Sequence, residues 1–105
     1  RAGSIAISAV TYGELLYGAA KSRDAGEVRR VLERFTEQVP VLPIDESAAS
    51  QYGALRAVLE QRGEVIGNND LWIAAHALAR KLVLVTNNER EFRRVPALKL
   101  QNWAR

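Results

Sequence analysis

Apolar residues along the chain recur at two different spacings, which predicts an alternation of strands and helices. Residues 5–10 (IAISAV) form a short apolar run rich in strand-forming residues, the pattern of a buried strand. Ser8 and Thr11 are suitable caps for a helix that follows, and Gly18 is expected to end it. Residues 24–38 carry apolar side chains at helical spacing with charges between them, so a second helix is predicted there.

A second strand is predicted in residues 39–44, and Asp45 then caps a long amphipathic helix. The apolar face of that helix consists of Ala48, Tyr52, Leu55 and Leu59. Asn68 or Asn69 is expected to cap the next helix, which is apolar on nearly all sides and therefore buried. The remaining predicted elements are a core strand at 82–86, a turn or short helix at 87–92 and an edge strand at 98–103.

Short buried strands that alternate with helices are typical of an α/β fold with a parallel sheet. The 105 residues have the length of one compact unit, so a single domain over residues 1–105 is expected. Lys and Arg exceed Asp and Glu by 15 to 12, and a net charge of +3 permits a polyanionic partner without requiring one. The chain contains no cysteine, which excludes disulfides and thiol chemistry and fits the cytoplasm. No apolar run is long enough to span a membrane, so no membrane partner is expected.

The chain contains no methionine and opens with Arg1-Ala2-Gly3-Ser4 directly before an apolar run. Because translation starts on methionine, the expectation is that this chain is the C-terminal part of a longer one.

Acidic and amide side chains follow the predicted strands. In parallel α/β sheets, binding and catalytic sites lie at these carboxyl ends of the strands. Glu14 follows the first strand, Asp70 opens the buried helix, and Asn88 and Glu91 follow the strand that ends at Thr86. Each acid also has a structural explanation, because acids are common at helix starts: Thr11 and Glu14 match a capping box, and Asp70 suits a helix dipole. Two ionised carboxylates that lay close together beside the apolar core would repel each other. A bound Mg²⁺ would be the simplest way to neutralise this repulsion.

Three segments with these residues resemble motifs of the PIN-domain ribonucleases of the VapC toxin type. Residues 7–18 (ISAVTYGELLYG) are similar to the second acidic motif of that family, and residues 66–77 (IGNNDLWIAAHA) to the third. Residues 84–92 (LVTNNEREF) are similar to the fourth, and the ending 95–103 (VPALKLQNW) also resembles that subgroup. The resemblance extends along the whole chain and implies a PIN-like three-layer α/β/α fold with a mostly parallel sheet.

The resemblance also implies site residues and a cofactor. Glu14 and Asp70 would be metal-binding acids of an endoribonuclease that depends on Mg²⁺ or Mn²⁺, and Thr86 and Thr11 would support the site. Many PIN domains have an aspartate where this chain has Asn88, which adds no negative charge, so Glu91 is the candidate substitute.

The chain differs from the family at its N-terminal end. The family begins with a central strand that carries a principal metal-binding aspartate, and the chain contains no such segment. The expectations are that a separate fragment supplies this missing N-terminal strand and that the chain alone has little activity.

The other candidate residues are basic or aromatic. Lys21, Arg90 and Arg93 are the candidates for RNA binding, because they follow Glu14 or adjoin the fourth motif. The single histidine, His76, and the two tryptophans, Trp72 and Trp103, are interpreted as packing residues rather than as catalytic or base-stacking groups.

The predicted function is that of a toxin in a toxin–antitoxin pair, which hydrolyses RNA with a metal-activated water. The resemblance suggests transfer RNA as substrate, a VapB-type antitoxin as partner, and a homodimer. One alternative is a non-catalytic PIN-like module that binds nucleic acid or antitoxin. Another is an unrelated doubly wound domain such as a receiver-like signalling protein, which is disfavoured because no aspartate ends a predicted strand.

Overall fold

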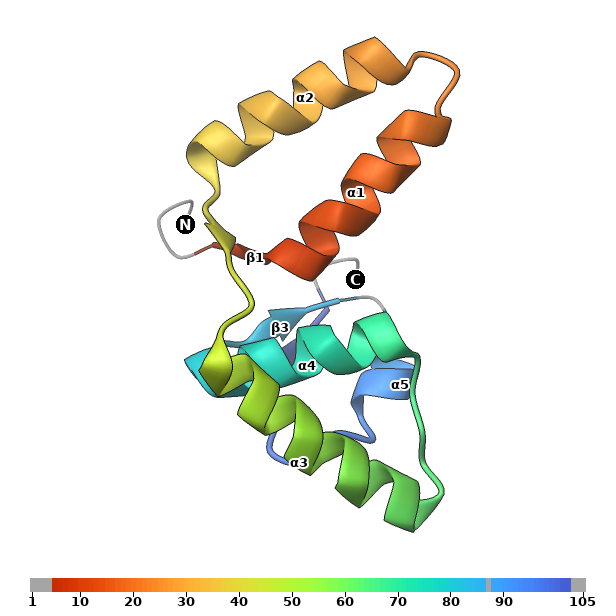
Figure 1. Ribbon diagram of the computed structural model, residues 1–105, viewed down its shortest axis with the longest axis vertical. Coiled ribbons are helices and arrows are strands. Elements are labelled where there is room, and N and C mark those ends of the chain that lie inside the picture. The colour runs from red at the N-terminus through yellow and green to blue at the C-terminus, as the bar shows by residue number, and fades with distance from the viewer. Residues whose placement is uncertain (1–4, 87, 103–105) are drawn as a thin grey trace. The chain divides into compact units, whose positions relative to one another are not determined.

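The computed structural model describes residues 5–86 and 88–102, which form helices and short parallel strands in two compact units, Arg1–Ile44 and Asp45–Arg105. Figure 1 shows the elements of both units in chain order. The alternation of helices with parallel strands is that of the predicted α/β class. The expectation of a single domain stays a prediction.

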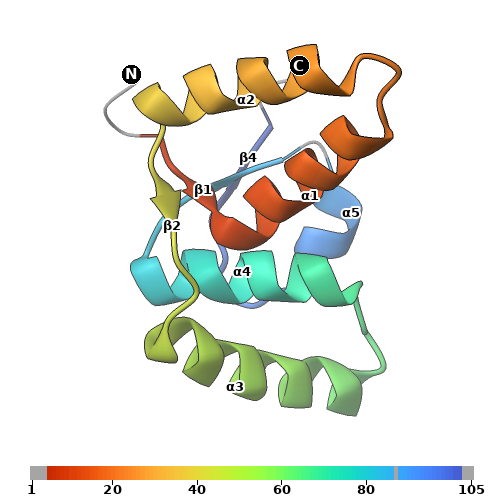
Figure 2. The same ribbon diagram turned by 45° about the horizontal axis from the view of Figure 1, so that its top comes forward.

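The first unit is a helical hairpin between two paired strands. Its elements are β1 (Ile7–Ser8), α1 (Ala9–Lys21), α2 (Ala25–Gln38) and β2 (Val41–Leu42). The strands are parallel, with Ile7 opposite Val41 and Ser8 opposite Leu42, and Figure 2 shows them side by side.

The two ends of α1 agree only in part with the sequence prediction. Ser8 caps α1 as predicted, because its hydroxyl accepts a hydrogen bond of 3.1 Å from the N–H of Val10. The predicted end at Gly18 is wrong: α1 continues to Lys21, since alanines follow the glycine and the backbone turns only where the N–H of Ser22 bonds to the carbonyl of Ala19. The predicted strand over 5–10 is likewise reduced to β1.

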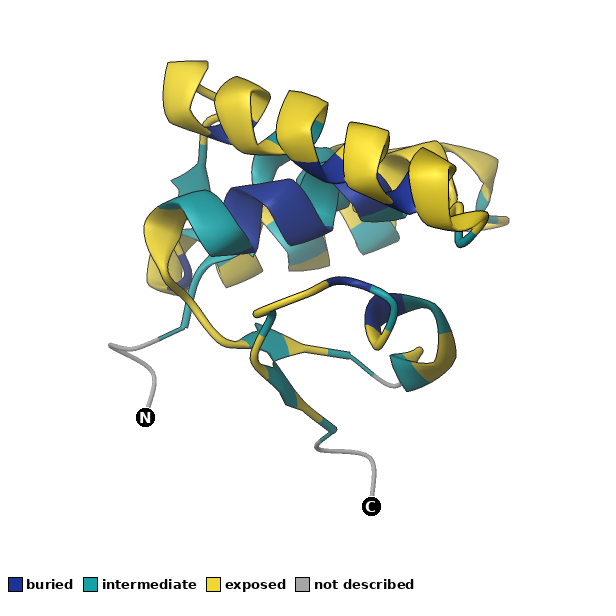
Figure 3. Cartoon of the chain, turned by 90° about the horizontal axis from the view of Figure 1, so that it is seen from below, coloured by how far each residue is buried: buried dark blue, intermediate teal, exposed yellow. Residues whose placement is uncertain are grey.

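The second unit is built on two helices, α3 (Glu46–Arg62) and α4 (Asn68–Arg80). Asp45 caps α3 as predicted, with its carboxylate accepting a 3.0 Å hydrogen bond from the N–H of Ala48. Gly63 ends α3 in the left-handed conformation at φ 67°, which suits a residue without a side chain. Figure 3 shows buried residues along α4 and on one side of α3, as expected for two helices that pack together.

The core of the second unit joins these helices to the C-terminal segment. It consists of Leu55, Leu59, Ile66, Leu71, Ala74, Phe92 and Val95, with Tyr52 packed against its edge. Beyond α4 lie β3 (Leu84–Val85), the short α5 (Glu89–Phe92) and β4 (Leu100–Gln101). β3 and β4 are parallel, with Leu84 opposite Leu100.

Three predictions for the second unit differ from the structure. Neither Asn68 nor Asn69 caps α4, because Gly67 occupies the N-cap position and makes no side-chain hydrogen bond. The predicted core strand over 82–86 is paired only at Leu84 and Val85, and Val85 is 41% exposed, because within the described residues β3 has one neighbouring strand. The predicted last strand is reduced to β4, and Trp103 lies outside the described residues.

Among the described residues, no helix combines the length and the apolar character that crossing a bilayer requires.

Candidate active site

The start of α4 and the segment around α5 meet at one point in the second unit. One oxygen of Glu91, Oε1, accepts a 2.8 Å hydrogen bond from the backbone N–H of Gly67, the N-cap residue of α4. A Cβ atom built on Gly67 would lie 3.8 Å from that oxygen and 4.0 Å from Oδ2 of Asp70. The carboxylates of Glu91 and Asp70 therefore lie beside the same backbone position, although the two residues are distant in sequence.

Asn88 and Thr86 arrange the segment that holds Glu91. The amide Nδ2 of Asn88 donates a 3.3 Å hydrogen bond to Oε2 of Glu91, so both oxygens of that carboxylate accept hydrogen bonds. The hydroxyl of Thr86 accepts a 3.0 Å hydrogen bond from the backbone N–H of Asn88 and thereby fixes the turn after β3. Asn87, between them, lies outside the described residues.

The electrostatics of this site favour an ionised Glu91. The hydrogen bond from the Gly67 N–H holds the pKa of Glu91 below its ordinary value, and the Asn88 amide, the positive charge of Arg94 and the Asp70 side chain act in the same direction. Partial burial opposes them. Glu91 is thus a fixed negative charge at the start of α4, where the helix dipole also favours an anion.

Arg94 was not singled out from the sequence, yet it ties the same segments together. Its Nη1 atom donates a 2.8 Å hydrogen bond to the carbonyl of Val65, just before α4. No local pattern could have identified this contact, because it joins residues far apart along the chain.

The predicted site residues of the first unit all lie on α1. Glu14 is exposed, and Thr11 is half-buried one turn earlier. The capping-box explanation of Thr11 and Glu14 is wrong, because α1 begins at Ala9 and Ser8 is its cap. The approach of Glu14 to Asp70 stays a prediction.

The basic candidates have different surroundings. The ammonium of Lys21 lies 4.6 Å above the ring of Tyr17. Arg93 forms an ion pair of 3.5 Å with Glu89, and Arg90 is exposed on α5.

The residues interpreted as packing groups lie within the second unit. His76 is 3% exposed on α4, as expected for a packing role. Trp72 stacks on Tyr52 with ring centroids 3.9 Å apart, while Trp103 lies outside the described residues.

The donor atoms of this site suit a hard divalent cation. Carboxylate and amide oxygens of Asp70, Glu91 and Asn88 are the ligands that Mg²⁺ prefers. Within the described part of the second unit, however, no three His, Cys, Asp or Glu side chains form a group that could hold a metal ion. The second unit therefore offers a partial site, to which water or further residues would have to contribute ligands.

Comparisons with known proteins point to one family. The model of the PIN domain matches residues 1–98 of the chain. The chain is 44% identical to a protein of Rickettsia felis named ribonuclease VapC2, over 95% of this chain and 75% of the relative. It is 43% identical to the tRNA(fMet)-specific endonuclease VapC of Shigella flexneri, over 97% of this chain and 77% of that protein.

Solved structures agree in fold. A structure of VapBC-1 from nontypeable Haemophilus influenzae matches with a TM-score of 0.92 and 42% identity, over 96% of this chain and 75% of the other. VapBC2 from Rickettsia felis, bound to a DNA fragment from its promoter, matches with a TM-score of 0.91 and 44% identity, over 95% of this chain and 75% of the other.

Proposed function

The chain belongs to the PIN-domain family and to its VapC ribonucleases, and from that premise we propose that it is the toxin of a toxin–antitoxin pair, an endoribonuclease that uses a divalent metal. The observation that carries the proposal is the meeting of Asp70 and Glu91 at the start of α4. Water is the nucleophile, and Mg²⁺ or Mn²⁺, when bound, supplies a positive charge that acidifies water and offsets charge on the phosphate.

The chain's own residues have distinct tasks in this proposal. Asp70 and Glu14 hold the metal through their carboxylate oxygens. Glu91 and Asn88 position the start of α4, and Glu91 adds negative charge that Asn88 cannot. Thr86 fixes the turn before α5, and Thr11 supports the segment that carries Glu14. Lys21, Arg90 and Arg93 bind phosphates of the RNA.

Substrate and partners follow from the relatives. The Shigella flexneri relative is named as a tRNA(fMet)-specific endonuclease, so transfer RNA is the proposed substrate. The matching structures of VapBC complexes support a VapB-type antitoxin as the inhibitor. An arginine or lysine of the antitoxin that paired with Asp70 and Glu14 would neutralise the acidic site. A homodimer is part of the same proposal.

The test measures the cleavage of total transfer RNA by the purified protein, produced from its natural gene. Cleavage should require Mg²⁺ or Mn²⁺ and stop on addition of EDTA. Asp70→Asn should lower the rate about 100-fold or more, because metal sites lose 10- to 100-fold even when an outer partner is changed. Asp24→Asn, at the exposed start of α2, is the matched control and should cleave normally.

A second candidate function is that of a binding module without catalysis. The amide of Asn88 in place of an acid, and the two hydrogen bonds that already occupy Glu91, favour it. RNA binding with no metal-dependent cleavage of any RNA pool would establish this function and overturn the first.

A further inference from the structure

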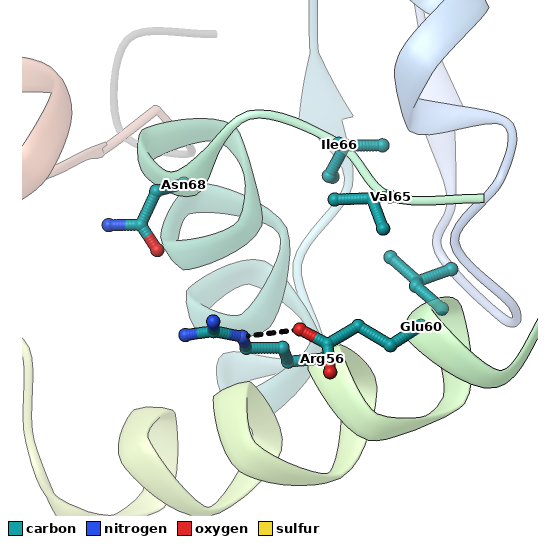
Figure 4. Close-up of a pocket in the computed structure, with 6 residues that line it drawn as sticks. Arg56, Glu60, Val65, Ile66 and Asn68 are labelled. Atoms are coloured by element: carbon teal, nitrogen blue, oxygen red, sulfur yellow. Dashed lines mark hydrogen bonds and ion pairs between the residues drawn. The ribbon is translucent and has the colours of Figure 1, made fainter. Parts of the chain in front are cut away.

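A pocket of about 140 Å³ opens in the second unit between α3 and the connection that leads to α4. Figure 4 shows its lining, which consists of Arg56, Leu59, Glu60, Val65, Ile66 and Asn68. We propose that this pocket binds one unpaired base of the RNA. The inference rests on the proposed function, since it names a determinant by which an RNA nuclease would recognise its substrate.

The pocket combines apolar walls with a paired charge. Leu59, Val65 and Ile66 supply the apolar surface, and Leu59 and Ile66 belong to the buried core of the unit. On α3, Nε of Arg56 donates a 2.9 Å hydrogen bond to Oε2 of Glu60. Figure 4 shows this pair on the helix side and the two branched residues of the connection on the other side.

The paired charge selects a neutral ligand. An anion such as a phosphate would meet the carboxylate of Glu60, and a cation would meet the guanidinium of Arg56. A neutral ring with polar edges satisfies both the apolar walls and the hydrogen-bonding groups. Unpaired bases are such rings, and RNA-binding proteins commonly hold them by apolar contact and by their Watson–Crick edges.

The hydrogen-bonding groups also favour one kind of base. An ionised carboxylate only accepts hydrogen bonds, so Glu60 prefers a base that presents N–H donors. The Oδ1 atom of Asn68 accepts a 2.6 Å hydrogen bond from the hydroxyl of Tyr52, so this oxygen is already engaged. Guanine carries two adjacent N–H donors, which match the acceptor oxygens of a carboxylate, so we expect guanine to bind best.

A network of side chains holds the pocket in shape. Nη1 of Arg56 donates a 3.2 Å hydrogen bond to the hydroxyl of Tyr52, whose ring stacks on Trp72. Groups that are already ordered lose little entropy on binding, so this network favours affinity.

The pocket adjoins the candidate active site through the chain itself. Asn68 lines the pocket and is the first residue of α4, and Asp70 lies two residues later in the same first turn. A base held in the pocket would therefore be bound beside the same first turn of α4 that carries Asp70, on a different side of the helix.

The test measures binding of short, labelled RNA oligomers that are identical except for the central position, which is guanine, adenine, cytosine, uracil or an abasic ribose. The protein carries Asp70→Asn so that the oligomers stay intact. The abasic oligomer has the same charges, so it separates base recognition from attraction to phosphates. We expect the guanine oligomer to bind about tenfold more tightly than the abasic one, within the range measured for single bases on protein surfaces.

Two variants connect the preference to the pocket. Glu60→Gln should remove most of the advantage of guanine, and Val65→Phe should narrow the pocket and weaken every oligomer that has a central base. The matched control is Glu33→Gln on α2, where Glu33 pairs with Arg29 in the same i,i+4 arrangement at 3.5 Å. Circular dichroism establishes that each variant is folded.

The outcomes separate this inference from the proposed function. Equal binding of all five oligomers, or equal effects of Glu60→Gln and Glu33→Gln, would overturn the base pocket even if the native protein cleaves transfer RNA. A guanine preference that depends on Glu60, without cleavage by the native protein, would support the pocket and overturn the nuclease. Failure to bind any oligomer would overturn the pocket.

Discussion

At the scale of single residues, Glu91 explains how two distant segments are held together. Its carboxylate accepts hydrogen bonds from the Gly67 N–H at 2.8 Å and from the Asn88 amide at 3.3 Å. Gly67 is the N-cap residue of α4, and Glu91 satisfies its backbone N–H, which would otherwise depend on water. Glu91 is therefore a positioning residue for Asp70, which lies in the first turn of that helix.

This contact makes stability depend on pH. The pKa of Glu91 is below its ordinary value, because the Gly67 N–H stabilises the ionised form. The stabilisation is therefore present above the ordinary pKa of glutamate and is lost as the pH falls through the folded-state pKa. Glu91→Gln should lower the free energy of unfolding by about 1 kcal/mol at neutral pH, the size of a hydrogen bond to a charged group after screening by solvent.

Urea denaturation of the native protein and the variant at a series of pH values measures this difference. The difference should shrink toward zero in acid, where native Glu91 is protonated. Glu37→Gln on the exposed surface of α2 is the control and should have little effect. A difference that is constant from neutral to acid pH would contradict the assignment of the effect to the charge.

At the scale of elements, the start of α3 is held by a side-chain cap and by an ion pair to α4. Asp45 accepts a hydrogen bond from the Ala48 N–H at 3.0 Å and lies 3.7 Å from Nη2 of Arg80 at the end of α4. The pKa of Asp45 is lowered most by the Ala48 N–H; desolvation, the next largest effect, opposes this, and the charges of Arg80 and His76 lower the pKa further. Its contribution to stability is therefore present at neutral pH and is lost as the pH falls through the folded-state pKa.

Asp45→Ala should lower the melting temperature by a few degrees at neutral pH, because the first turn of α3 loses its cap. Asp45→Asn should lower it less, since asparagine also caps helices well, and the difference between the two variants reports the cap alone. Thermal denaturation followed by circular dichroism measures both. If the two variants melted at the same temperature at neutral pH, the Arg80 ion pair rather than the cap would be the source of the stabilisation.

Elements that are fixed by interactions between residues close in sequence could be predicted, and elements that depend on distant residues could not. The caps Ser8 and Asp45 bond to backbone within three residues, so the sequence pattern was sufficient. The cap of α4 was wrongly assigned to Asn68 or Asn69: the N-cap is Gly67, and the group that bonds to its N–H is Glu91, 24 residues away. β3 is shorter than its apolar run predicted, since strand length depends on pairing with neighbouring strands rather than on hydropathy. The candidate acids Asp70 and Glu91 were identified, but the hydrogen bond that joins Glu91 to Gly67 depends on the tertiary fold.

At the scale of the whole molecule, the two proposed metal ligands Glu14 and Asp70 belong to different units. The second unit brings two acids together at the start of α4, while Glu14 lies on α1 of the first unit. A divalent cation shared by Glu14 and Asp70 would stabilise the folded state by an amount that depends on its concentration. Because a ligand set acts as a unit, loss of either acid should remove most of this stabilisation.

A double-mutant cycle with Glu14→Gln and Asp70→Asn measures that coupling through the rise in free energy of unfolding on addition of Mg²⁺. For the native protein, Mg²⁺ at 100 times its Kd should add about 2.7 kcal/mol. Each single variant should lose most of this increment, and the double variant should lose little more than either, so the two losses are not additive. Glu37→Gln should keep the full increment. If Glu14→Gln also kept it while Asp70→Asn did not, Glu14 would not be a ligand, and the metal would be held by the second unit and water alone.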